Sequence, residues 1–282
     1  MVDNGRDRMR RRVARSVTAL AAGIAGGGLA VACTASTTHA GPTEDAPKPT
    51  IILEHGAFAD GSSWNDVIER LRKDGYPVVA AANPLRGPTG DASTLRSLIG
   101  RVDGPVVLVG HSYGGSVISA AGAGNDKVEA LVYVAAFLPA PGETALELTN
   151  RYPGSTLPST LNPVPYTTFD GTTGTDLYIQ QDKFRDQFAA DVPAERAALM
   201  AAGQRPIAQA ALEEKATAAA WNEKPSWDVI TTQDLNIPVE AQRFMADRAH
   251  AHVTEVAASH SVAVSHPDVV AEVIEQAAAA TR

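Results

Sequence analysis

The chain has 282 residues and a formal net charge of −8, and hydrophobic residues make up 44% of it, so a wholly disordered chain is excluded. The single cysteine, Cys33, excludes an intrachain disulfide framework and a cysteine-rich metal site. The acidic balance excludes a general nucleic-acid binder, whose affinity depends on basic residues that contact phosphates. These properties indicate a globular protein with one domain, or with one domain that carries an insertion.

The first forty residues differ in composition from the rest of the chain. They contain six arginines and two aspartates, and the arginines precede an uncharged stretch at 16–32 that is rich in Ala, Gly, Val and Leu. A basic segment, an apolar segment and small residues at its end are typical of a secretory signal peptide, here residues 1–40. The adjacent arginines also allow twin-arginine export. We therefore expect a secreted or cell-envelope protein, with residues 41–49 as a linker to a domain at 50–282.

The sequence is compatible with two alternative cleavage sites for this leader. Ala30-Val31-Ala32-Cys33 resembles a bacterial lipoprotein signal, in which the cysteine carries a lipid, although Leu29 lies one position too early for that pattern. Cleavage after Thr38-His39-Ala40 would instead release a protein without any cysteine. A lipid anchor at Cys33 is the one form of membrane association that the sequence predicts.

From residue 50 onward, apolar runs alternate with helix-like segments. The runs have the continuous Val, Ile and Leu content of strands buried on both faces, and they lie at 50–54, 77–82, 105–110, 129–137, 228–232 and 253–257. The helix-like segments lie at 62–74, 91–102, 114–123, 239–249 and 267–279. Strands that alternate with helices predict an α/β fold, with a mostly parallel central sheet flanked by helices.

The stretch at about 138–226 interrupts this alternation. Its first part, 153–175, is rich in Pro, Thr and Gly, and its second part, 184–220, is rich in Ala and helix-like. We predict an inserted helical cap over the carboxyl edge of the sheet, where open α/β sheets bind their ligands.

The most informative motif is Gly110-His111-Ser112-Tyr113-Gly114, which follows a Val-rich strand and precedes a helix of small residues. It has the G-x-S-x-G pattern of a nucleophile elbow, in which a serine occupies a strained turn between strand and helix. Side chains at the two glycines would collide with the neighbouring strand and helix. The alternative is a tight glycine turn with a structural serine. We predict Ser112 as the nucleophile, at the amino end of a helix whose dipole favours negative charge.

A serine nucleophile needs a base, and the base needs an acid that orients it. In this fold the three follow in the order serine, acid, histidine. Asp234, on the loop after the fifth predicted strand, is the predicted acid, whereas Asp228 is expected to be a solvent-facing group at the start of that strand. His260, on the loop after the last strand, is the predicted base. His266 is the alternative base, but it directly precedes the closing helix, where a cap or packing role is expected.

Catalysis by a serine nucleophile also requires an oxyanion hole, which stabilises the negative charge of the tetrahedral intermediate. Gly56 allows a sharp turn after the first strand, so that the backbone N–H of Ala57 faces the pocket, and the N–H of Tyr113 is the predicted second donor. His55 is expected to bridge loops behind the hole. Candidates for lining a substrate pocket, each of which also fits a plain core role, are Phe58, Trp64, Phe137, Leu138 and Trp221.

A metal site is not predicted. His250 and His252 have an H-x-H spacing that can bind zinc, but the sequence places no third ligand nearby. We expect a solvated junction between a helix and a strand at these two histidines.

Several motifs together resemble the α/β-hydrolase superfamily, and within it the small bacterial esterases related to plant methylesterases, hydroxynitrile lyases and pyrethroid-hydrolase-type carboxylesterases. The resemblance spans residues 50–280. The motifs that carry it are Gly110–Gly114, His55-Gly56-Ala57 with Asp60-Gly61-Ser62-Ser63-Trp64, Val132-Tyr133-Val134-Ala135-Ala136-Phe137, Gln242-Arg243-Phe244-Met245, Ser259-His260 and Ser265-His266-Pro267.

The resemblance implies the α/β-hydrolase fold, hydrolytic activity without a cofactor, a triad of Ser112, Asp234 and His260, and backbone donors at Ala57 and Tyr113. Plant hydroxynitrile lyases have a lysine directly after the triad aspartate, and here Leu235 occupies that place. We therefore predict a serine carboxylic-ester hydrolase for a small apolar or aromatic ester. The alternatives are a perhydrolase, a lactone or amide hydrolase with the same triad, and a non-catalytic envelope binding protein.

Overall fold

The computed structural model describes residues 47–281. The predicted leader with Cys33 and most of the predicted linker lie outside the described residues. None of the helices between residues 47 and 281 combines the length and the apolar character that a membrane span needs.

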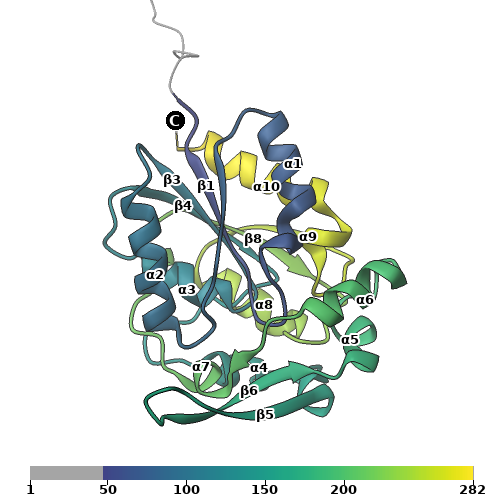
Figure 1. Cartoon of the computed structure of the whole chain (residues 1–282). Coiled ribbons are helices and arrows are strands. Elements are labelled where there is room, and N and C mark those ends of the chain that lie inside the picture. The colour runs from purple at the N-terminus through teal and green to yellow at the C-terminus, as the bar shows by residue number, and fades with distance from the viewer. Residues whose placement is uncertain (1–46, 282) are drawn as a thin grey trace, which may run out of the picture. The chain divides into compact units, whose positions relative to one another are not determined.

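A sheet of six strands forms the centre of the domain (Figure 1). Its strand order is β2-β1-β3-β4-β8-β9, and each adjacent pair is parallel, which confirms the predicted mostly parallel sheet. The strands are β1 (Thr50–Glu54), β2 (Val78–Ala81), β3 (Val106–His111), β4 (Val128–Val134), β8 (Ser226–Thr231) and β9 (His252–Val256).

The continuous apolar runs arise because both faces of the sheet are covered. Successive side chains of a strand point to opposite faces. Ile51 and Leu53 therefore pack into one hydrophobic cluster, and Ile52 packs into the other. Val107 and Leu108 in β3 divide between the two clusters in the same way. All five of these β1 and β3 positions are fully buried, so none of them is available for a polar residue.

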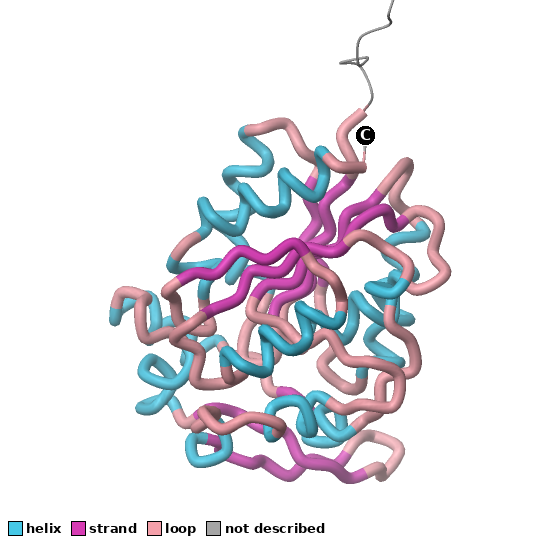
Figure 2. The backbone as a smooth tube through the Cα atoms, turned by 180° about the vertical axis from the view of Figure 1, so that it is seen from behind, coloured by secondary structure: helices cyan, strands magenta, loops and turns pink. Residues whose placement is uncertain are grey.

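Helices cover the two faces separately (Figures 1 and 2). One face carries α1 (Asn65–Lys73), α9 (Val262–Ser265) and α10 (Pro267–Ala279), whose buried side chains, apart from Val264, belong to the cluster with Ile51. The other face carries α2 (Pro88–Gly100), α3 (Gly114–Gly122) and α8 (Val239–Arg248). A short 3-10 helix, η1 (Gly61–Trp64), precedes α1.

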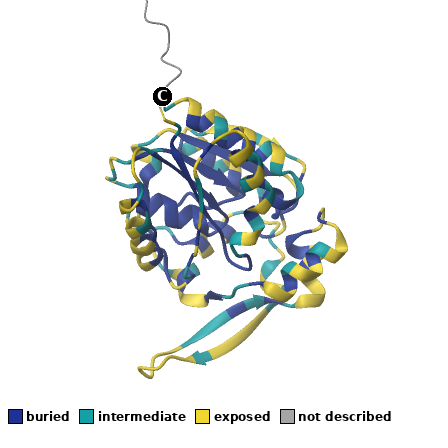
Figure 3. Ribbon diagram, turned by 45° about the horizontal axis from the view of Figure 1, so that its top comes forward, coloured by how far each residue is buried: buried dark blue, intermediate teal, exposed yellow. Residues whose placement is uncertain are grey.

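The segment between β4 and β8 forms the cap (green in Figure 1), and it contains strands as well as the predicted helices. Its helices are α4 (Ala145–Asn150), α5 (Gln181–Phe188), α6 (Ala194–Gly203) and α7 (Gln209–Glu213), with the 3-10 turns η2 (Leu157–Thr160) and η3 (Ala220–Asn222). Its antiparallel sheet has the order β5-β6-β7, from β5 (Leu161–Thr167), β6 (Thr173–Ile179) and β7 (Ile207–Ala208). The β5–β6 hairpin extends away from the rest of the domain and is largely exposed (Figure 3).

Candidate active site

Ser112 lies in a strained turn between β3 and α3, with φ of 55°. A positive φ is unfavourable for a residue with a side chain, so the surroundings must hold the turn in place. The backbone N–H of Ser112 donates to Val134 in β4, and the Ser112 carbonyl accepts from Gly115 and Phe137. These contacts fix the direction in which the hydroxyl points.

The two glycines of the motif are required by close approach. A Cβ atom at Gly110 would lie 2.7 Å from the backbone of Gly114, and a Cβ atom at Gly114 would lie 2.5 Å from the Glu54 carbonyl oxygen. Both distances are far below van der Waals contact. Any larger residue would therefore push strand and helix apart.

The loop after β1 approaches the same turn. A Cβ atom at Gly56 would lie 2.6 Å from the Cβ atom of Ser112, so the glycine is needed for this approach. The sharp backbone turn that we predicted at Gly56 is instead at Phe58, which has φ of 59°. The Phe58 N–H donates to Arg205, whereas the N–H groups of Ala57 and Tyr113 have no acceptor among residues 47–281.

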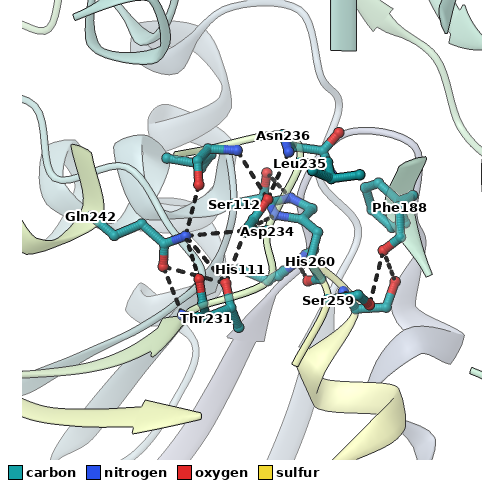
Figure 4. A network of polar contacts seen from close by, with 12 residues as sticks. His111, Ser112, Phe188, Thr231, Asp234, Leu235, Asn236, Gln242, Ser259 and His260 are labelled. Atoms are coloured by element: carbon teal, nitrogen blue, oxygen red, sulfur yellow. Dashed lines mark hydrogen bonds and ion pairs between the residues drawn. The ribbon is translucent and has the colours of Figure 1, made fainter. Parts of the chain in front are cut away.

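The three predicted side chains are joined by hydrogen bonds in the order Asp234, His260 and Ser112, and we call these three residues the row (Figure 4). The Nε2 atom of His260 lies 2.8 Å from the Oγ atom of Ser112, and its Nδ1 atom lies 2.6 Å from the Oδ2 atom of Asp234. The side chains of His260 and Asp234 are 1% and 0% exposed. The loops after β8 and β9 bring them to the sheet edge where Ser112 lies, because the carboxyl ends of parallel strands share one edge.

Asp234 is held at both carboxylate oxygens. Its Oδ1 atom accepts from the backbone N–H groups of Asn236 and Ile237, at 2.7 and 3.0 Å. Its Oδ2 atom accepts from the Thr231 hydroxyl at 2.9 Å and the Gln242 amide at 3.1 Å, besides its contact with His260. Sequence reasoning did not find Thr231 or Gln242, although Gln242 belongs to a motif of the resemblance.

His111, from the serine motif, supports the loop of His260. Its Nε2–H donates to the His260 carbonyl at 2.9 Å. Burial, together with the nearby His260, lowers the pKa of His111 to about 3, so His111 stays neutral. Behind the Ala57 loop, His55 donates to the Gly56 carbonyl and accepts from the Asn83 N–H, and burial lowers its pKa.

An acidic cluster lies behind Tyr113. The Tyr113 hydroxyl donates to Asp91 at 2.8 Å, and this carboxylate also accepts from the backbone N–H groups of Arg86 and Gly87. Glu54 is 1% exposed, and its Oε2 atom has no hydrogen-bond partner in the described part of the chain. Burial, followed by the charge of Asp91, raises the pKa of Glu54 to about 8, so its neutral form is favoured near pH 7.

A small cavity of about 70 Å³ opens beside Ser112 and His260. The predicted residues Phe58 and Phe137 line it together with Ala57 and Tyr113. Sequence reasoning missed its other apolar lining, which comes mainly from the cap: Leu146, Leu157, Pro158, Leu161, Leu212 and Ile237. Its remaining polar lining is Thr149 and Asn236, so the cavity offers an almost wholly apolar surface.

Three predicted pocket residues do not line this cavity. Trp64 is fully buried in the cluster on the α1 and α10 face, where its ring packs edge-on against His111. Leu138 is also fully buried, in the opposite cluster. Trp221 donates from its indole N–H to the Pro139 carbonyl, away from Ser112. At each of these three positions, the large apolar side chain packs in or against the hydrophobic core instead of lining the cavity.

Asp228 and His266, two further predicted positions, do not line the cavity either. Asp228 is 1% exposed rather than solvent-facing, and neither of its carboxylate oxygens has a hydrogen-bond partner among the described residues. Burial raises its pKa well above the usual value. His266 lies at the start of α10 and contacts Ser265 and Asp191 instead of Ser112. The described residues contain no group of three side chains arranged to hold a metal ion.

Comparison with known proteins identifies the family. A sequence model of the α/β hydrolase family matches residues 51–273, and the chain belongs to that family. It is 29% identical over 254 residues to an α/β hydrolase, nvfD, of Aspergillus novofumigatus, covering 82% of this chain and 97% of that protein.

Relatives named as esterases and hydrolases match as well. A carbendazim hydrolyzing esterase of a Nocardioides species is 34% identical over 110 residues, which cover 34% of this chain and 46% of that enzyme. The crystal structure of a pyrethroid hydrolase from Sphingobium faniae JZ-2 superposes with a TM-score of 0.66 at 25% identity, covering 82% of this chain and 98% of that one. Within its family, the chain is a carboxylesterase-like hydrolase.

Proposed function

We propose that the protein is a serine carboxylic-ester hydrolase that works through an acyl-enzyme on Ser112. The observation that carries this proposal is the buried row in which Asp234, His260 and Ser112 are joined at 2.6 and 2.8 Å beside an open cavity. A hydroxyl is a weak nucleophile until a base removes its proton, and the base must be held in the correct tautomer. The Nδ1–H of His260 donates to Asp234, which leaves Nε2 free to accept the Ser112 proton.

The reaction then has two halves. His260 takes the Ser112 proton as Oγ attacks the ester carbonyl, and it returns that proton to the departing alcohol as the carbon–oxygen bond breaks. Water, deprotonated by His260, attacks the acyl-enzyme, and Ser112 regains its proton as the carboxylic acid leaves. The free N–H groups of Ala57 and Tyr113 stabilise the oxyanion in both halves, a contribution worth roughly 10²–10³ in rate for each donor.

The cavity lining supports a small, uncharged ester with an apolar acyl or alcohol group. Leu146, Leu157 and Leu212 of the cap face the cavity, and no Asp, Glu, Lys or Arg among the described residues lines it. A charged substituent would lose its hydration there without gaining a partner. The relatives named for pyrethroid and carbendazim are consistent with apolar or aromatic substrates.

The test compares Ser112→Ala with Ser116→Ala, a matched control one helical turn further along α3. Ser116 is also buried, and its hydroxyl has no partner among the described residues. We expect Ser112→Ala to abolish p-nitrophenyl ester turnover and labelling by a fluorophosphonate, and Ser116→Ala to keep both. Full activity in Ser112→Ala would overturn the proposal. A panel of esters, lactones and amides separates the ester hydrolase from the alternative activities, and an inert wild type would indicate a binding protein.

We also propose that the protein is exported, with residues 1–40 as its leader. The basic segment followed by an apolar stretch supports this. The mass of the mature protein distinguishes the two cleavage sites, because a lipid on Cys33 adds the mass of its acyl chains, whereas cleavage after Ala40 removes the cysteine. A mature protein that keeps residues 1–30 would contradict export.

A further inference from the structure

The end of cap helix α5 contacts both loops that carry the proposed acid and base. We define the α5 bracket as Gln187 and Phe188, in the last turn of the helix, and Asp191, three residues beyond it. These residues lie far from Ser112, Asp234 and His260 in the sequence, and none of them lines the cavity. Figure 4 shows Phe188 beside Ser259 and His260, with Leu235 and Asn236 above them.

Gln187 binds the loop of the proposed acid. Its side-chain amide donates to the Leu235 carbonyl at 2.8 Å and to the Asn236 Oδ1 atom at 3.0 Å. Its own Oε1 atom accepts from the Thr156 hydroxyl at 2.7 Å. Gln187 is 4% exposed, and its bond to Asn236 is buried. Asn236 also donates its backbone N–H to Asp234, which links the bracket directly to the carboxylate.

Asp191 and Phe188 bind the loop of the proposed base. The Asp191 carboxylate accepts from the Ser259 backbone N–H at 3.1 Å and from the Ser259 hydroxyl. The Phe188 carbonyl accepts from the Ser261 hydroxyl at 2.8 Å. Ser259 and Ser261 are the neighbours of His260 on either side, so the bracket holds the backbone before and after the imidazole.

The Phe188 ring completes the contact with the imidazole itself. Its centroid lies 4.9 Å from that of His260, with the two rings inclined at 69°. The ring also packs edge-on against His111, whose Nε2–H donates to the His260 carbonyl. The imidazole is therefore enclosed between the cap and the elbow.

We propose that Gln187 and Asp191 are positioning residues, which hold the loops of Asp234 and His260 at the separation that proton transfer requires. The two loops follow the neighbouring strands β8 and β9, and the Gln233 N–H donates to the Ala258 carbonyl between them. Beyond this bond and the contact between Asp234 and His260, the bracket bonds to both loops from the cap side. A row that depends on a 2.6 Å and a 2.8 Å contact is sensitive to small shifts, and a misplacement of about 1 Å costs up to about 10²-fold in rate. This inference rests on the proposed ester hydrolysis.

The first test uses three variants measured well below their melting temperatures. Asp191→Ala removes both acceptors, and we expect kcat to fall about 10- to 100-fold with KM within about twofold. Asp191→Asn can still accept from the Ser259 N–H and donate to its hydroxyl, so it is expected to restore kcat to within about threefold of wild type. Asp186→Ala, on the exposed face of α5, is the matched control and should leave kcat unchanged.

The second test concerns the acid loop. Gln187→Glu keeps the shape of the side chain but removes both N–H donors, and it is expected to lower kcat by a similar factor. Gln181→Glu makes the same change at an exposed position of the same helix and serves as its control. In proton NMR, the low-field resonance of the His260 Nδ1–H should shift or broaden in Gln187→Glu and Asp191→Ala, and stay unchanged in the controls.

The route through Ser259 is tested by a double-mutant cycle. Because Asp191 acts through Ser259, the double variant Asp191→Ala/Ser259→Ala should lose no more kcat than the worse single variant. A double variant whose loss of kcat equals the product of the two single losses would overturn the proposal. So would an Asp191→Asn variant with as little activity as Asp191→Ala, because the charge of Asp191 would then be responsible. Bracket variants that lower only the melting temperature would also overturn it.

Failure of this inference is distinguishable from failure of the proposed function. If Ser112→Ala is inactive and the bracket variants behave like their controls, the hydrolase assignment stands and the bracket is merely structural. If Ser112→Ala keeps full activity, both proposals fail.

Discussion

Replacing Glu54 by glutamine should make the protein more stable, and increasingly so as the pH rises. Glu54 lies at the end of β1 with its Oε2 atom unpartnered among the described residues, and burial next to Asp91 raises its pKa from 4.5 to about 8. Below pH 4.5 the folded and unfolded chains both bind this proton. Between pH 4.5 and about 8 only the folded chain keeps it, so stability falls as pH rises through this window.

The magnitude follows from the difference between the two pKa values. Each pH unit in the window costs about 1.4 kcal/mol, so Glu54 lowers the free energy of unfolding by at most about 5 kcal/mol once the pH exceeds 8. Total stabilities of about 5–15 kcal/mol make such a loss conspicuous. Glutamine resembles the protonated acid and cannot ionise, so Glu54→Gln should avoid the loss above pH 8.

Urea unfolding followed by tryptophan fluorescence, at pH values from 5 to 9, measures the effect. The free energy of unfolding of Glu54→Gln relative to wild type should grow with pH across the window and become constant above it. Asp228, whose pKa is also raised, is present in both proteins and cancels in the comparison. Glu69→Gln, on the exposed face of α1, is the matched control. A stability difference between Glu54→Gln and wild type that is the same at pH 5 and pH 9 would contradict this expectation.

Three further substitutions test other parts of the structure. Asp234→Asn should lower kcat by about 10⁴-fold, because His260 then takes the wrong tautomer, and the same change in a serine-protease triad causes a loss of this size. A loss of kcat below tenfold in ester assays would contradict this prediction. Gly56→Ala places a Cβ atom 2.6 Å from that of Ser112, so calorimetry should show destabilisation of about 1–3 kcal/mol, accompanied by lower kcat. Asp228→Leu removes a buried carboxylate that has no hydrogen-bond partner within residues 47–281, and it should raise the unfolding free energy at pH 7 by about 1–3 kcal/mol. A lower melting temperature for this variant would count against the expectation.

The central sheet could be predicted because its signal is local. Each strand is buried on both faces, so its sequence is a continuous apolar run, and the run ends where the chain turns. The three polar residues of the row were predictable for a related reason. Ser112, Asp234 and His260 each follow a strand of one parallel sheet, and such strands end at the same edge.

The cap hairpin could not be predicted in the same way. β5 contains Pro163 and Pro165, which are tolerated because β5 is an edge strand, with β6 as its one partner. Only Leu177 and Ile179 of the β5–β6 pair are buried, so neither strand has a strong apolar pattern. Prolines and exposed threonines gave the segment the composition of a loop.

The contacts that the cap makes with the loops of the site could not be predicted from the sequence either. Asp191 and Ser259 are 68 residues apart, and no local pattern links them. Trp64 and Leu138 illustrate the opposite error, since their apolar character fits both a pocket and the core. Trp64 lies in the cluster on the other face of the sheet, whereas Leu138 shares a cluster with the cavity-lining Phe58 and Phe137 and still does not line the cavity, so tertiary packing decides between the two roles.

Acyl transfer is proposed to take place on the Ser112 hydroxyl. The most direct measurement is peptide mapping by mass spectrometry, after rapid acid quenching of the protein during turnover of a slowly hydrolysed p-nitrophenyl ester. We expect one acyl group per chain, on the peptide that contains Ser112, and none in the Ser112→Ala variant. Turnover by wild type with the acyl group on another residue, or with an equal adduct in Ser112→Ala, would contradict it.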